Sequence, residues 1–275
     1  MIAALLLLTI AIADLTMLVW QSARTRPLAV GVMVVALVGW PIVLIAGFSA
    51  PWWVALTFVV VAALWALALA SRWAARLVIP VGLLLAAALA ALLLVPTLAT
   101  LVQPSWADAW AATGAVISPT VATMAVAVAV FLAHSANVIV RATLTLARRA
   151  DTHTAERSTE PEVSAGSWIV AGKWRWARVQ VMPPEPAAPR VISTMRGGRW
   201  IGPLERWAIV ALGLAGALGI IAAIMAGKGI VRFPEINADR GIGSKAEEFL
   251  VGSLLSWSLA GCGIALIVGA ATVAG

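Results

Sequence analysis

The chain has 275 residues, of which 62% are hydrophobic and 11% are charged, and its mean hydropathy is +1.00. This excludes an ordinary soluble domain, in which about 25% of residues are charged, and predicts an all-α, polytopic membrane protein. The net charge of +7 is explained by basic loops that orient the chain in the membrane, so we expect no nucleic-acid partner. A single cysteine, Cys262, excludes an internal disulfide and a cysteine metal site.

Apolar segments long enough to cross a bilayer, which takes about 20 helical residues, recur along the chain. They lie near residues 2–21, 29–48, 52–71, 77–101, 115–140, 205–226 and 249–272. Because backbone polar groups in lipid must be satisfied within each segment, we expect about seven transmembrane helices. The chain then divides into a five-helix region (1–140), a basic loop (141–203) and a C-terminal two-helix hairpin (204–275) with a charged connection at 228–248.

Lys and Arg are distributed unequally among the predicted connections. Basic residues follow the first, third and fifth segments, whereas residues 47–52 and 103–112 contain none. Basic loops stay on the cytoplasmic side of a membrane. The expected topology therefore has the N-terminus outside and the C-terminus in the cytoplasm.

The basic loop contains two stretches that are typical of linkers, residues 152–162 and 183–189, on either side of the Trp- and Arg-rich segment 168–182. That segment is either a small hairpin or lies on the membrane. We expect its basic and Trp residues to contact anionic lipid headgroups, or alternatively to bind a protein partner.

Three polar residues are predicted to form an intramembrane site. Asp14 lies in the first segment, and a carboxylate there costs at least about 2.5 kcal/mol unless it is paired, protonated or hydrated. His134 and Asn137 share one face of the fifth segment, and the spacings to Gln21 and Arg141 place Asp14 and His134 at a similar depth. A contact between Asp14 and His134 would relay a proton or hold a cation, or would only join two helices.

Small residues repeat at helix-packing intervals in two of the segments. The residues are Gly31, Gly39 and Gly47 in the second segment, and Gly213, Gly216 and Gly219 in the sixth. Such residues let helices approach closely. We expect packing within the chain, with a homo-oligomer or a larger membrane complex as the alternative.

The C-terminal third contains three linked motifs. They are GGRWIGPLER near the start of the sixth segment, KGIVRFPE at its end and EFLVGSLLS at the start of the seventh. The positions that carry the pattern are Gly198, Ile201, Gly202, Leu204, Glu205, Arg206, Lys228, Ile230, Arg232, Phe233, Glu235, Glu248, Phe249, Gly252, Leu254 and Ser256. Pro203 is expected to open the sixth helix, with Glu205 in its first turn and Arg206 at the interface.

This module, residues 197–260, resembles an uncharacterised bacterial family of multi-span membrane proteins, known as a domain of unknown function. Gly229 and Pro234 depart from the family pattern. The resemblance implies a bacterial cytoplasmic (inner) membrane location and carries no activity. The first five segments resemble no family.

The connection at 228–248 holds four basic and four acidic residues. Lys228 and Arg232 share a helix face, and Glu247 and Glu248 open the next helix. Ion pairs between these basic and acidic residues would clamp the two helices together at the membrane interface. Alternatively, the same charges together with Glu235 would form a gate for ions or polar solutes, or a site that binds lipid headgroups.

Three functional classes remain open on the sequence. The first is a channel or transporter for an ion or small polar solute, and the second is a non-catalytic membrane scaffold or complex subunit. The third is a membrane enzyme with a lipid-linked substrate, for which Glu205, Glu248 and nearby basic residues are the candidates. Because the sequence has no catalytic, metal or nucleotide motif, an enzyme is the least favoured class and the cofactor is unknown.

Overall fold

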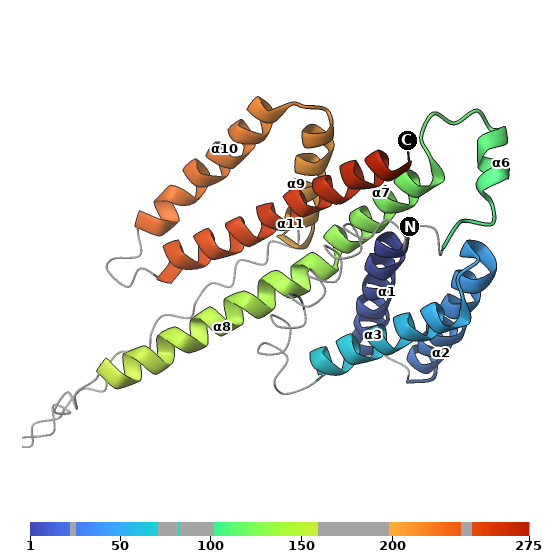
Figure 1. Ribbon diagram of the computed structural model, residues 1–275. Coiled ribbons are helices and arrows are strands. Elements are labelled where there is room, and N and C mark those ends of the chain that lie inside the picture. Colours follow the sequence, from blue (N-terminus) through green and yellow to red (C-terminus); the bar gives the residue numbers. More distant parts are fainter. Residues whose placement is uncertain (23–25, 71–81, 83–101, 159–197, 238–243, 275) are drawn as a thin grey trace, which may run out of the picture.

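The structure is a computed structural model in which residues 1–22, 26–70, 82, 102–158, 198–237 and 244–274 are described (Figure 1). All regular structure in these ranges is helical. Three helical segments have the length and hydropathy of membrane spans, namely Ile2–Trp20, Pro119–Ala147 and Ala246–Thr272. Shorter apolar helices cover Val34–Gly47 and Trp52–Leu67. The predicted segment at 77–101 lies, except for Gly82, outside the described residues.

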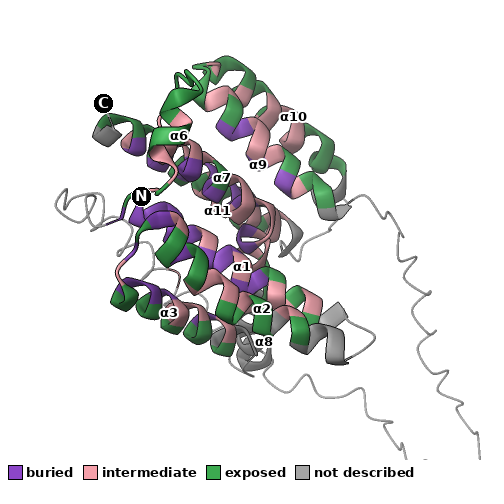
Figure 2. Ribbon diagram, turned by 90° about the vertical axis from the view of Figure 1, so that its right-hand side faces the viewer, coloured by how far each residue is buried: buried purple, intermediate pink, exposed green. Residues whose placement is uncertain are grey.

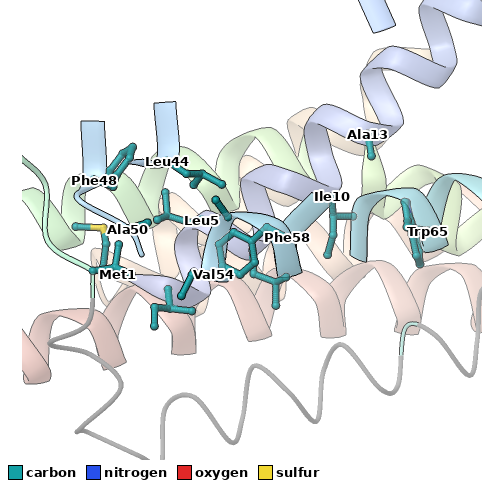
Figure 3. Close-up of a cluster of buried hydrophobic side chains, with 14 residues drawn as sticks. Met1, Leu5, Ile10, Ala13, Leu44, Phe48, Ala50, Val54, Phe58 and Trp65 are labelled. Atoms are coloured by element: carbon teal, nitrogen blue, oxygen red, sulfur yellow. The ribbon is translucent and has the colours of Figure 1, made fainter. Parts of the chain in front are cut away.

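The N-terminal helices form one packed unit. Helix α1 (Ile2–Ser22) contacts α2 (Arg26–Ile42) and α3 (Trp52–Ala70), and a π-helical turn, η1 (Val43–Gly47), ends α2. Leu5 and Ile10 pack with Leu44, Phe58 and Trp65 in a buried apolar cluster (Figure 3). Between helices in lipid, such side chains contribute van der Waals packing and not transfer out of water. Three of the predicted segments are therefore helical with nearly the expected boundaries.

A second core joins helices that are distant in sequence. After the short α6 (Ala107–Ala112), α7 (Pro119–Ala133) and α8 (Ser135–Ser158) form one long element that packs against α1 and α11 (Ser244–Ala274). Its apolar core includes Leu7, Val128, Val210 and Leu266, and buried positions gather where α1, α7 and α11 meet (Figure 2). The bundle therefore centres on α7.

Gly263 lets α11 approach α7 and α9 (Gly198–Leu214) closely, because a Cβ there would lie 2.7 Å from Val128 Cγ1. Gly252, eleven positions earlier, faces Val140 and Leu144 of α8. Helix α11 thus runs antiparallel to the α7–α8 element.

The prediction of one helix over 205–226 was wrong. Helix α9 ends at Leu214, and α10 (Leu218–Asn237) turns back against it (Figure 1). Gly216 takes φ +73°, its amide donates to Gly213 O, and the Ala217 amide donates to Leu212 O. These bonds form a Schellman motif, which ends a helix at a left-handed glycine. The start of α9 and the end of α10 therefore lie at the same end of the hairpin.

Two helix boundaries also differ from the predictions. Helix α8 continues to Ser158, through part of the predicted linker at 152–162, because no Pro or Gly interrupts it before Pro161. Helix α9 begins at Gly198, so Pro203 lies inside the helix and does not open it. The predicted loop at 141–203 is thus helical at both ends, and its segment 168–182 lies outside the described residues.

Candidate functional site

The α7–α8 element is interrupted at His134, in the middle of the apolar segment Pro119–Ala147. His134 has φ −125° and ψ −60°, outside the helical range, and α8 restarts at Ser135. Asn137 occupies the first turn of α8, and its side-chain amide donates a 3.1 Å hydrogen bond to Ala133 O. Polar groups from several helices surround this interruption.

Arg206 of α9 is the central polar side chain of the site. Only 2% of it is exposed. Its Nε donates to Leu132 O at 3.0 Å and its Nη1 donates to Ser256 Oγ of α11 at 3.1 Å. Its Nη2 donates to Asn137 Oδ1 at 2.6 Å. All three acceptors are uncharged, so hydrogen bonds to neutral groups hold a buried cation.

Neighbouring residues of α9 support this arrangement. Trp207 Nε1 donates to Ala129 O of α7 at 2.9 Å. At Gly202, a Cβ would lie 3.3 Å from Asn137 Oδ1 and 3.6 Å from Arg206 Nη1. A glycine thus leaves room for the pair formed by Arg206 and Asn137.

Asp14 lies on α1, which also packs against the α7–α8 element, and 2% of it is exposed. Its Oδ1 accepts a 2.7 Å hydrogen bond from Trp65 Nε1 of α3. Among the described residues, Asp14 Oδ2 and the buried Ser135 Oγ have no hydrogen-bond partner. Ser135 lies close to the carboxylate but outside hydrogen-bonding geometry, and His134 lies within electrostatic range of it.

The predicted intramembrane residues therefore gather around one interruption, but not as one contact. His134 and Ser135 lie toward Asp14, whereas Asn137 is bonded to Arg206. The sequence analysis had linked Asn137 to His134 by helix face and had placed Arg206 at an interface.

Glu205 and Lys228 form a second polar group next to Arg206. Lys228 Nζ lies 2.7 Å from Glu205 Oε2 and 5.7 Å from the centre of the Trp257 ring, and Trp257 Nε1 donates to Glu205 Oε1 at 2.8 Å. The side chain of Lys228 is 30% exposed and that of Glu205 is 9% exposed. The ion pair therefore joins α9, α10 and α11 near the surface.

The observed ion pair differs from the predicted clamp. Lys228 of α10 pairs with Glu205 of the antiparallel helix α9, whereas the sequence analysis had paired Lys228 with Glu247 or Glu248. Arg232 and Glu247 are exposed and Glu248 is partly buried. Glu235 lies in the last turn of α10. Residues 238–243 of the predicted connection lie outside the described residues.

Cavities near the site have apolar walls. One of about 120 Å³ is bordered by Ile10, Trp65, Phe131 and Leu259, and another of about 330 Å³ lies between α1, α2 and α3. In the described part of the chain, no three His, Cys, Asp or Glu residues come together to hold a metal ion. The site therefore combines two buried ionisable side chains, Asp14 and Arg206, with neighbouring cavities that have apolar walls.

Sequence reasoning missed the roles of Trp65, Ser135 and Trp257. Trp65 was assigned to a helix without a polar role, although it lies well inside an apolar segment and not at its end. An indole N–H in that position needs an acceptor. This was the available signal for a buried partner.

Comparisons of the chain with protein-family models, with curated proteins and with solved structures find no match. The resemblance of residues 197–260 to a bacterial membrane family thus rests on its motifs alone.

Proposed function

We propose that the protein is an integral membrane transport protein that moves an ion or a small polar solute across a bacterial cytoplasmic membrane. The observation that carries this proposal is the interruption at His134 within an apolar span. In transporters, interrupted helices line the substrate and ion sites, because irregular backbone at membrane depth is tolerated where protein or a polar cavity satisfies it.

The side chains around the interruption support the same function. Asp14 and Arg206 are each 2% exposed, and they lie on two different helices, α1 and α9, that both pack against α7. Ionisable residues within a membrane are costly and are commonly found on ion or solute pathways. A purely structural role would be met at lower cost by apolar packing.

The proposal includes a topology that differs from the one expected from loop charges. Because α9 and α10 form a hairpin joined by the Glu205–Lys228 pair, we place residues 141–203 and 228–248 on the same side of the membrane. With the basic loop in the cytoplasm, α11 then carries the C-terminus to the outside.

Flux into proteoliposomes tests the function. Full-length protein in vesicles is assayed for uptake of protons, Na⁺, K⁺, Cl⁻, phosphate, an amino-acid mixture and glucose, with protein-free vesicles as the baseline. We expect flux of at least one probe, reduced about tenfold by Ser256→Ala, which removes an acceptor of Arg206, and unchanged by Ser258→Ala, an exposed position on the same helix. Folded protein that passes none of these probes would overturn the proposal.

A further inference from the structure

Asp14 Oδ2 and Ser135 Oγ are two buried polar atoms, close to each other, that lack hydrogen-bond partners within the described residues. An unpartnered buried polar atom costs about 1–3 kcal/mol, and more when it carries charge. Protonation of Asp14 would give both atoms a hydrogen-bond partner. If Asp14 Oδ2 carries a proton, its O–H donates to Ser135 Oγ, while Oδ1 keeps the hydrogen bond from Trp65.

We propose that Asp14 is a proton-binding group and that His134 delivers its proton past Ser135. The inference rests on the proposed transport function and assigns the proton as the ion that is moved or that drives movement of a solute. The Arg206 cluster is separate from this step, because Arg206 donates to three neutral acceptors, Leu132 O, Ser256 Oγ and Asn137 Oδ1.

The ligand count favours a proton over a metal cation. Hard cations such as Mg²⁺ and Ca²⁺ take about six or more oxygen ligands. Near Asp14, the described side chains offer two unpartnered oxygens, Asp14 Oδ2 and Ser135 Oγ. A proton needs one base and one acceptor, and these two atoms supply both.

His134 is the group that we assign to exchange a proton with Asp14. Helices α2, α3, α7 and α8 pack against α1, and among their described residues His134 is the charged or titratable group that acts on Asp14. The indole of Trp65 faces Asp14 but does not titrate. His134 is only partly buried, whereas the cavity beside Trp65 has apolar walls that give a proton no acceptor.

The transfer conserves both charge and atoms. An N–H bond of the His134 imidazolium breaks, and an O–H bond forms at Asp14 Oδ2. Both groups become neutral, and the Ser135 hydroxyl accepts the new O–H. In the reverse step the O–H bond at Asp14 Oδ2 breaks and the N–H bond at His134 forms again, which restores the carboxylate and the imidazolium.

Infrared difference spectroscopy on the full-length protein in lipid nanodiscs tests the proposal, with pH as the variable. We expect a pH-dependent carboxylic-acid C=O band that is present in the wild type and absent from Asp14→Asn. Asp108→Asn, the same substitution at an exposed aspartate of α6, should retain the band. Ser135→Ala should shift its frequency, because the acid loses its acceptor. In Asp14→Glu the band should return.

The outcomes separate this proposal from the transport function. Identical spectra for wild type and Asp14→Asn would overturn the proton site even if the vesicles transport a probe. If the band titrates but no probe is transported, the proton site stands and the transport function fails. If Asp14→Asn does not fold, an unshifted band in folded Ser135→Ala overturns the proposal, and a shifted band supports it.

Discussion

The guanidinium of Arg206 donates a 2.6 Å hydrogen bond to the amide oxygen of Asn137, a residue 69 positions earlier in the chain. The same guanidinium bonds the Leu132 carbonyl on the other side of the interruption at His134. Arg206 therefore bridges the end of α7 and the start of α8, and the interrupted helix depends on a side chain from α9.

Replacing Arg206 by Lys should destabilise the protein by about 2–4 kcal/mol, because an ammonium group cannot reproduce the fork of donors and leaves buried acceptors unpaired. Thermal unfolding in detergent micelles measures the loss. Arg141→Lys, at an exposed position of α8, is the matched control and should change the midpoint little. Equal midpoints for the two variants would contradict the bridging role of Arg206.

The Glu205–Lys228 pair should show a coupling energy of about 0.5–1 kcal/mol in a double-mutant cycle of Glu205→Gln and Lys228→Gln. The value is modest because water screens Lys228, whose side chain is 30% exposed. Chemical unfolding of the two single variants and the double variant gives the coupling. Glu205→Gln combined with Arg141→Gln should be additive, and a zero coupling for the first pair would show that the pair does not join α9 to α10.

Gly216→Ala should destabilise the α9–α10 hairpin by about 1–2 kcal/mol, because a side chain at φ +73° is strained. Gly219→Ala lies in α10, where a Cβ meets nothing within 4 Å, so it should be neutral or stabilising by up to about 1 kcal/mol. Thermal unfolding of both variants tests the turn. A continuous helix over 205–226 would abolish this difference, since both alanines would then favour the helix.

Gly263→Ala should cost about 1–3 kcal/mol, because its Cβ would lie 2.7 Å from Val128 Cγ1 and would push α11 away from α7. Gly261→Ala on the same helix faces open space and serves as the control. The midpoints of thermal unfolding should separate the two variants, and similar values would mean that α11 does not approach α7 at Gly263.

The α9–α10 hairpin predicts on which side of the membrane residues 238–243 and the C-terminus lie. A reporter fused after residue 275 should be active only outside the cytoplasm, while one inserted in residues 238–243 should be active only inside. Alkaline phosphatase and green fluorescent protein, which work on opposite sides of a bacterial inner membrane, provide the two readouts. A cytoplasmic C-terminus would restore the topology expected from loop charges and would contradict the placement of residues 141–203 and 228–248 on the same side of the membrane.

By itself, the sequence predicted an all-helical chain with apolar segments of membrane-spanning length, and it located α1, α2, α3 and α11. Long apolar segments must be helical in lipid, because no water is present to bond their backbone groups. It also singled out Asp14, His134 and Asn137, since polar residues are conspicuous in such segments.

Only the tertiary structure decided where helices break and which polar groups meet. Gly216 looks like Gly213 and Gly219 in the sequence, yet it alone of the three has the left-handed conformation that ends α9. His134 interrupts a span without a proline or glycine, because Arg206, from a helix far along the chain, bonds carbonyl and amide groups on both sides of it. The pairing of Asp14 with Trp65, 51 positions apart, likewise depends on packing between helices, which local patterns of apolar residues do not encode.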